Sequence, residues 1–125
     1  LGNLNAKRDW GHAKDFVKAM WLILQQDEPD DYVIATGHQY SVRQFIEKCA
    51  PKFGFDIEWF GNGKDEIGID KKTKKTIISV NPKYLRPAEV ETLLGDATKA
   101  KEKLGWVPEI GFDQLVEDMI YQKRI

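Results

Sequence analysis

Apolar residues recur at helical spacing near the start of the chain, and this pattern limits most strongly what the chain can fold into. The positions i, i+3, i+4, i+7, i+8 and i+11 are Ala13, Phe16, Val17, Met20, Trp21 and Leu24. Residues at this spacing share one wide face of an α-helix, which we expect over 10–26. The acidic turn at 27–31 follows, and its Pro29 disfavours a helical conformation in the residue before it.

A strand and a second helix are predicted next. Residues 32–36 read Tyr-Val-Ile-Ala-Thr, a short β-branched run that favours a buried strand, and Gly37 closes it. Ser41 and Gln44 form the Ser-x-x-Gln pattern of a capping box, which satisfies two free amides at the start of a helix. We expect this helix to end near Gly54.

The charged stretch at 61–75 separates two further predicted strands, at 57–60 and 76–80. We expect this stretch to form an exposed hairpin loop, with Asp70 and the neighbouring lysines at a solvated tip.

Two helices are predicted in the last third of the chain. Asp96 caps a short helix, which Gly105 ends. The final helix has one apolar face, made of Phe112, Leu115, Val116, Met119 and Ile120. The fold class is therefore α/β, a small mixed α/β domain in which helices dominate.

Composition excludes several classes of partner. With 125 residues, 42% of them hydrophobic, the chain can bury one modest core, so we expect one domain over 1–125. Its 19 Lys+Arg and 20 Asp+Glu give a net charge of −1, which offers no global field for nucleic acid or an anionic membrane. No apolar run approaches the roughly 20 residues of a transmembrane helix.

The single cysteine indicates a reducing compartment. Cys49 has no partner for an internal disulfide and stands among apolar residues, which suits a small buried side chain. The first residues lack a signal-peptide pattern, so we expect a cytoplasmic protein. The chain opens without Met, on Leu1, in a sequence typical of a strand end, and we interpret this start as a cut in a longer polypeptide.

Two arginines in irregular segments are candidate ligand residues. Arg8 and Arg86 each carry a planar fork of N–H donors, and two forks converging from separate loops suit a diphosphate. Glu89 can accept hydrogen bonds from ribose hydroxyls or a guanine edge. Spacing alone favours the alternative of weak surface ion pairs, in which Arg8 pairs with Asp9 or Asp15 and Arg86 pairs with Glu89 or Glu91.

The sequence contains neither a metal-ligand motif nor a catalytic motif. His12 lacks a second ligand at metal-binding spacing, so we interpret it as a partly buried structural histidine. Gly61-Asn62-Gly63 does not continue into a dinucleotide-binding loop, and no tyrosine has a lysine four positions later. We therefore expect no catalytic residue, no metal site and no cofactor site in this chain, and no hydride transfer by it alone.

Distinctive sequence blocks follow one another in order along nearly the whole chain. The more specific blocks are Arg-Asp-Trp, starting at Arg8, and Arg-Pro-x-Glu-Val, starting at Arg86. The others include Leu1-Gly2-Asn3-Leu4-Asn5-Ala6-Lys7, Ser41-Val42-Arg43, Gly95-Asp96-Ala97-Thr98 and Lys103-Leu104-Gly105-Trp106. In this order the blocks resemble those of GDP-mannose 4,6-dehydratases, members of the extended short-chain dehydrogenase/reductases.

The resemblance implies an enzyme of two parts. An N-terminal Rossmann domain, upstream of Leu1, would bind NADP and carry the catalytic Thr, Glu, Tyr and Lys. The C-terminal part, represented by 1–125, would close over the GDP-sugar. Such lyases convert GDP-mannose to GDP-4-keto-6-deoxymannose, on the way to GDP-fucose, and the complete enzyme is expected to be a homo-oligomer.

The resemblance also assigns roles to individual residues. It implies that Arg8 and Arg86 hold the diphosphate and that Glu89 holds the nucleoside, with Asn3 and Lys7 as further members of the rim. Two alternatives stay open: a non-catalytic nucleotide-sugar-binding or assembly module, and part of a dehydratase or epimerase for another nucleoside diphosphate sugar. Without the Rossmann domain, we expect exposed apolar surface and self-association.

Overall fold

The computed structural model describes residues 1–86 and 94–123. They form two compact units. The sheet unit comprises Leu1–Lys7 and Ser41–Thr92, and the helical unit comprises Arg8–Tyr40 and Leu93–Ile125. The chain passes from one unit to the other within β1 (Lys7–Arg8) and β2 (Tyr40–Ser41), which form a two-stranded sheet.

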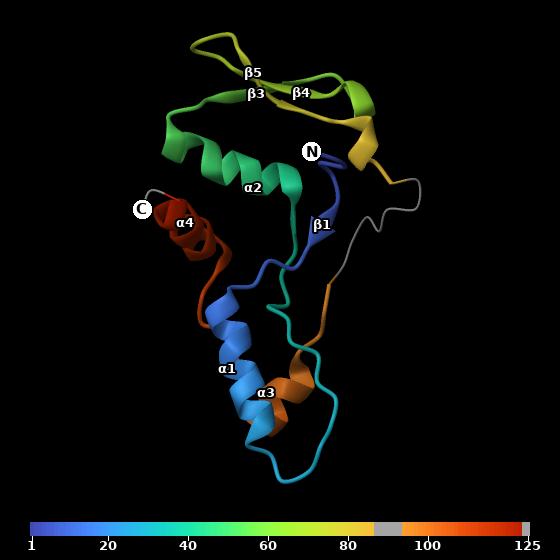
Figure 1. The fold of residues 1–125 in the computed structure, drawn as a ribbon, viewed down its shortest axis with the longest axis vertical. Helices are drawn as coiled ribbons and strands as arrows, with labels where there is room; N and C mark the ends of the chain where they lie inside the picture. Colours follow the sequence, from blue (N-terminus) through green and yellow to red (C-terminus); the bar gives the residue numbers. More distant parts are fainter. Residues whose placement is uncertain (87–93, 124–125) are drawn as a thin grey trace. The chain divides into compact units, whose positions relative to one another are not determined.

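A three-stranded antiparallel sheet and one helix build the sheet unit. The strand order is β3-β4-β5, with β3 at Ile57–Phe60, β4 at Ile67–Asp70 and β5 at Thr76–Ser79. Helix α2 (Val42–Cys49) runs along one face of this sheet (Figure 1). The two predicted strands are confirmed as β3 and β5, so the mixed α/β class is confirmed too.

The capping box at the start of α2 is confirmed. The Ser41 hydroxyl accepts from the Gln44 N–H at 3.1 Å, and the Gln44 side chain accepts from the Ser41 N–H at 2.7 Å. A 3-10 helix, η1 (Ala50–Phe53), continues the turn to Gly54, whose φ of 82° is easily adopted only by glycine. Cys49, expected to be buried, has intermediate exposure.

The prediction of an exposed hairpin loop over 61–75 is wrong in its middle, which contains the 3-10 helix η2 (Gly63–Asp65) and β4. Glycine and aspartate are poor strand formers, so the local pattern at 67–70 does not indicate a strand. Tertiary packing outweighs this weak local preference. Gly68 pairs with Trp59 across the sheet, and a Cβ on Gly68 would lie 3.0 Å from the indole ring.

Asp70 is buried at the end of β4, directly before the turn at 71–75, so its assignment to a solvated tip is wrong. Its side chain is among the most buried of the chain, with the residue 2% exposed. The carboxylate accepts from the Asp56 N–H at 3.1 Å and from the Thr73 hydroxyl at 2.9 Å. The hydrogen bond from Asp56 is the largest cause that holds the pKa of Asp70 below its ordinary value of 3.8, and the bonds from Thr73 and Lys72 add to it.

Replacing this carboxylate by Asp70→Asn should destabilise the chain at neutral pH, because an amide cannot accept all of these bonds. A carboxyl whose pKa is lower in the folded chain stabilises the fold above its unfolded pKa, and this contribution is lost as pH falls through the folded pKa. The melting temperatures of wild type and variant should therefore converge below pH 3.8. A difference in melting temperature that stays constant into strong acid would contradict this role. Asp65→Asn, at an exposed position, is the control.

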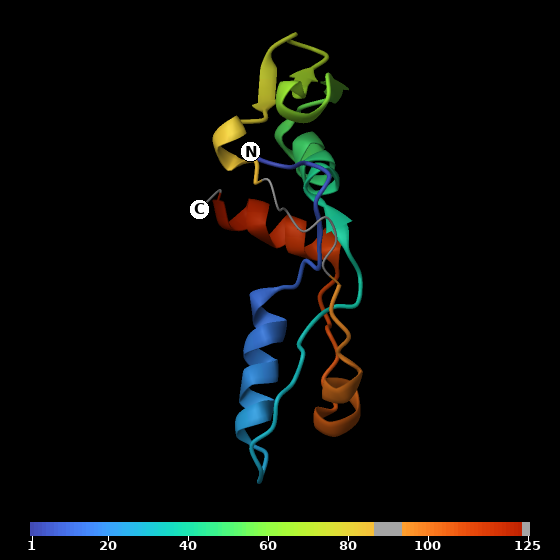
Figure 2. The ribbon, with the colours of Figure 1, turned by 90° about the vertical axis from the view of Figure 1, so that its right-hand side faces the viewer.

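Three helices build the helical unit: α1 (Ala13–Leu24), α3 (Thr98–Leu104) and α4 (Phe112–Lys123). Helices α1 and α3 lie side by side (Figures 1 and 2). Ala19, Ala100 and Trp106 are at most 1% exposed and form the centre of the core. No helix within the described ranges is long and apolar enough to cross a membrane.

Caps and buried polar bonds fix the ends of these helices. The N-cap of α3 is Ala97, which makes no side-chain cap bond, so the predicted cap at Asp96 is wrong by one residue. The Asp96 carboxylate instead accepts from the backbone N–H and the hydroxyl of Thr98, the first residue of the helix. These bonds, with the hydroxyl bond as the larger cause, hold the pKa of Asp96 below 3.8. Gly105, with φ 68°, ends α3 as predicted. Asp15, a buried residue of α1, accepts from the Glu109 and Ile110 N–H groups at 3.2 and 3.0 Å. These bonds attach the segment before α4 to α1.

The apolar face predicted for α1 is largely exposed. Four of its residues are 60–79% exposed: Val17, Met20, Trp21 and Leu24. The side of the helix that packs in the core instead carries Ala19, with Phe16 and Leu22 against it. The helical unit therefore presents a large apolar surface, here called the α1 face and defined by those four exposed residues.

The prediction of a strand at 32–36 is wrong. This segment pairs with no strand among the described residues. It nevertheless packs on the core through Tyr32 and Ile34, and Ala35 is buried. At its end, the Thr36 N–H donates to the Asp9 carboxylate at 2.9 Å. β-Branched residues favour an extended chain, but a strand also requires a neighbouring backbone.

Candidate functional site

Two segments of the sheet unit carry sequence-predicted site residues and lie against each other. The first is 1–6, which contains Asn3, and the second is 79–86, which contains the 3-10 helix η3 (Pro82–Tyr84) and Arg86. The Asn81 N–H donates to the Leu1 carbonyl at 2.7 Å. A Cβ on Gly2 would lie 2.5 Å from the Tyr84 carbonyl oxygen, so only glycine permits this approach.

The first turn of α2 holds the N-terminal segment in place. The Arg43 N–H donates to the Leu4 carbonyl at 3.0 Å, and the Val42 N–H donates to the Ala6 carbonyl at 3.2 Å. These amides have no partner within the helix itself, so the N-terminal segment satisfies them. Leu4 and Ala6 are 2% and 4% exposed, and the segment is therefore anchored immediately before Lys7.

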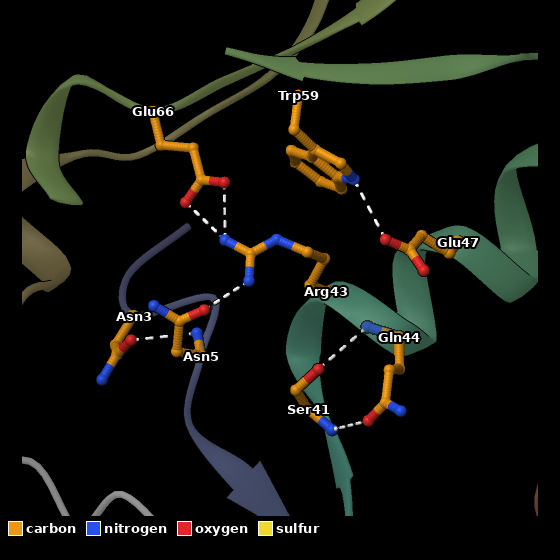
Figure 3. A network of polar contacts seen from close by, with 8 residues as sticks. All are labelled: Asn3, Asn5, Ser41, Arg43, Gln44, Glu47, Trp59 and Glu66. Atoms are coloured by element: carbon orange, nitrogen blue, oxygen red, sulfur yellow. Dashed lines mark hydrogen bonds and ion pairs between the residues drawn. The ribbon is translucent and has the colours of Figure 1, made fainter. Parts of the chain in front are cut away.

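The side chain of Arg43 extends this anchoring into a polar network (Figure 3). Its Nη2 lies 2.5 Å from both carboxylate oxygens of Glu66, and its Nη1 donates to the Asn5 side-chain oxygen. The guanidinium carbon lies 5.3 Å from the centre of the Trp59 ring. One arginine thus joins α2, the sheet and the N-terminal segment.

In the helical unit, the neighbours of Arg8 hold its backbone. The Asp9 carboxylate accepts from the Thr36 N–H and hydroxyl at 2.9 and 2.7 Å, and from the Gly37 N–H at 2.9 Å. The Trp10 indole N–H donates to the Tyr40 carbonyl at 2.8 Å. Within the Arg-Asp-Trp block, the aspartate and tryptophan therefore fix the position of Arg8, whose own exposure is intermediate.

The predicted site residues are distributed as follows. Arg86 is exposed and makes no hydrogen bond or ion pair within the described part of the chain, while Lys7 is exposed in β1. The Asn3 side-chain oxygen accepts from the Asn5 N–H at 3.0 Å. Asn3, Lys7 and Arg86 belong to the sheet unit and Arg8 to the helical unit. Glu89 lies outside the described residues, as does Glu91.

His12 has a structural role, as predicted. Its Nδ1 accepts from the Lys14 N–H at 3.0 Å and caps α1, while its Nε2 lies 3.1 Å from the Asp118 carboxylate. Among residues 1–86 and 94–123, no group of three His, Cys, Asp or Glu side chains could hold a metal ion.

Among the described residues, the helical unit contains hollows of about 310, 380 and 710 Å³. The largest is lined by residues near the start of α1 and by α4, including His12, Asp118 and Tyr121. Asn3, Lys7, Arg8 and Arg86 do not line these hollows. The candidate site residues in this chain are therefore not gathered in one of these hollows.

Comparison with known proteins decides the family. The profile of the GDP-mannose 4,6 dehydratase family matches residues 1–119. The chain belongs to this family. It is 56% identical over 121 residues to the human GDP-mannose 4,6 dehydratase and 54% identical over 130 residues to that of a Vibrio cholerae O1 strain. These alignments cover 97% and 96% of this chain but 32% and 35% of the relatives, so the chain spans about a third of their length.

This chain also matches about a third of the length of solved structures with a related fold. The RMD enzyme of Pseudomonas aeruginosa, complexed with NADPH, superposes with a TM-score of 0.71 at 19% identity, over all of this chain and 36% of that enzyme. The UDP-glucose 4-epimerase of Thermotoga maritima, with UDP-glucose, gives 0.73 at 23% identity, over 99% of this chain and 33% of the epimerase. The fold of this chain is thus that of part of an extended short-chain dehydrogenase/reductase.

Gly2→Ala should separate the N-terminal segment from η3, because the added methyl group would meet the Tyr84 carbonyl at 2.5 Å. We expect a loss of about 1–3 kcal/mol in the free energy of unfolding, measured by urea denaturation. Gly111→Ala is the matched control, since nothing lies within 4 Å of a Cβ there. Equal effects of the two substitutions would contradict the close approach of the two segments.

Proposed function

We propose that this chain is the nucleotide-sugar-binding part of a GDP-mannose 4,6-dehydratase. In the complete enzyme, GDP-mannose would be converted to GDP-4-keto-6-deoxymannose with NADP as the hydride carrier. The observation that carries the proposal is the family match over 1–119, which includes both the Arg-Asp-Trp and the Arg-Pro-x-Glu-Val blocks. The packing of segment 1–6 against 79–84 supports it, because this packing brings the residues around Asn3 near the chain that leads to Arg86.

The residues proposed to bind the GDP-sugar differ in role. Arg8 and Arg86 would each donate paired N–H groups to diphosphate oxygens, for which the planar guanidinium is well suited. The Arg86 residue is exposed, so solvent and ligand can reach it. Glu89 would accept from the nucleoside, and Asn3 and Lys7 would complete the rim.

The remaining two thirds of the enzyme would hold NADP and the catalytic residues. Support comes from the relatives, of which this chain spans about a third, and from the P. aeruginosa enzyme, which was solved with NADPH. We propose that the α1 face packs against that remainder. Trp21 and Leu24 are 60% and 79% exposed, and burying side chains of this size contributes about 1.5–3 kcal/mol each.

Arg86→Ala tests the site in a chimera in which this chain replaces the matching third of the human relative. The chimera should turn over GDP-mannose, and the substitution should weaken GDP-mannose binding by about 1.5–3 kcal/mol, roughly ten- to 150-fold, because a charged hydrogen bond is lost. Calorimetric titration gives the affinity, and product formation gives the activity.

The matched control removes a different exposed cation. Lys72→Ala lies at the hairpin tip between β4 and β5 and should leave the affinity unchanged. Undiminished binding by the Arg86→Ala chimera would overturn the role of Arg86. Turnover of only UDP- or dTDP-sugars would replace the GDP-sugar assignment by another nucleoside diphosphate sugar, and binding without any turnover would favour a non-catalytic module.

Charged substitutions in the α1 face test the proposed packing. In the 125-residue chain, Trp21→Glu with Leu24→Glu should suppress concentration-dependent self-association, measured by sedimentation, without loss of helix content. In the chimera, the same pair should lower the melting temperature, since the face would then be buried. Phe60→Glu, at an exposed apolar residue of the sheet unit, is the control. A chimera that tolerates the pair would refute the proposed contact.

A further inference from the structure

We propose that Arg43 is a positioning residue for nucleotide-sugar binding, which holds the N-terminal segment 1–6 in its binding conformation without touching the ligand. This inference rests on the function proposed above and adds to it a residue that lies outside the predicted site. Arg43 belongs to α2, and its partners Glu66 and Asn5 are 23 and 38 positions away in the sequence.

The guanidinium of Arg43 is already engaged within the protein. Its side chain is 23% exposed and that of Glu66 is 10% exposed, so the ion pair between them is largely removed from water. Both Glu66 oxygens lie 2.5 Å from Nη2, while Nη1 is bonded to Asn5, and the Trp59 ring lies alongside. A carboxylate this buried is costly to leave unpaired, so its ion pair with Arg43 keeps the arginine in place.

The contacts then lead from Arg43 to the predicted rim in short steps. Arg43 binds the N-terminal segment twice, through its backbone N–H to the Leu4 carbonyl and through its side chain to Asn5. The Asn5 N–H in turn donates to the Asn3 side-chain oxygen at 3.0 Å (Figure 3). Asn3, a predicted rim residue, is therefore oriented by a neighbour that Arg43 holds.

The geometry requires arginine and not merely a positive charge. The planar guanidinium presents separate nitrogens to Glu66 and to Asn5, in fixed directions. A lysine ammonium is a compact point charge, which could keep the ion pair with Glu66 but would not hold Asn5 in the same orientation. Arg43→Lys therefore separates the charge of residue 43 from its positioning of the N-terminal segment.

The test measures kcat and KM for GDP-mannose in the chimera, together with its melting temperature. Arg43→Lys and Arg43→Gln should each raise KM about tenfold and change kcat by less than about twofold, because only uniform binding is weakened. Glu47→Ala is the matched control: it removes the 3.1 Å bond to the Trp59 indole from the same helix and network, yet does not touch the N-terminal segment. KM of this variant should be unchanged.

A double-mutant cycle then distinguishes positioning from general stability. Asn5→Ala should raise KM to a similar extent, and Asn5→Ala with Arg43→Gln should be no worse than either single variant, because both act through one contact. Additive effects, or a lower melting temperature with unchanged KM in Arg43→Gln, would overturn the role of Arg43. A wild-type chimera that neither binds nor turns over GDP-mannose would instead overturn the proposed function, and this role with it.

Discussion

Buried carboxylates that bond distant parts of the chain are the interaction on which the rest of this structure depends. Asp15 holds the backbone ahead of α4, Asp70 organises the β4–β5 hairpin, and Glu66 binds Arg43. All three residues are less than 9% exposed. Such groups are costly to bury without partners, so each one fixes the segments that supply its hydrogen bonds. In a chain with small apolar cores, these polar contacts determine how irregular segments are placed.

Polar contacts between distant residues also hold the backbone of the candidate site in place. Segment 1–6 has no regular structure of its own, yet the first turn of α2 binds its carbonyls and Arg43 binds Asn5. In the helical unit, Asp9 holds the backbone beside Arg8 in place, because its carboxylate accepts from the N–H and the hydroxyl of Thr36. Rigid backbone around a ligand-binding side chain reduces the entropy that binding must overcome. The Arg-Asp-Trp block therefore combines one proposed ligand residue with two residues that fix its position.

Exposed apolar surface distinguishes this chain from an ordinary globular domain. The α1 face is more exposed than the core-facing side of the same helix, although all four of its residues are apolar. Contiguous apolar surface of this kind is typical of an interface. The relatives are about three times as long as this chain, which is consistent with a face that is covered in the complete family enzyme.

The sequence by itself determined the helices, two of the three sheet strands, the caps at Ser41 and Gly105 and the family. These features depend on local periodicity and capping chemistry, or on motifs read directly from neighbouring residues. Only the tertiary structure decided that Ile67–Asp70 is a strand, that Asp70 is buried and that Arg43 joins the N-terminal segment to the sheet. Each of these depends on partners distant in the sequence, whose hydrogen bonds and burial outweigh the weak preferences of the local residues.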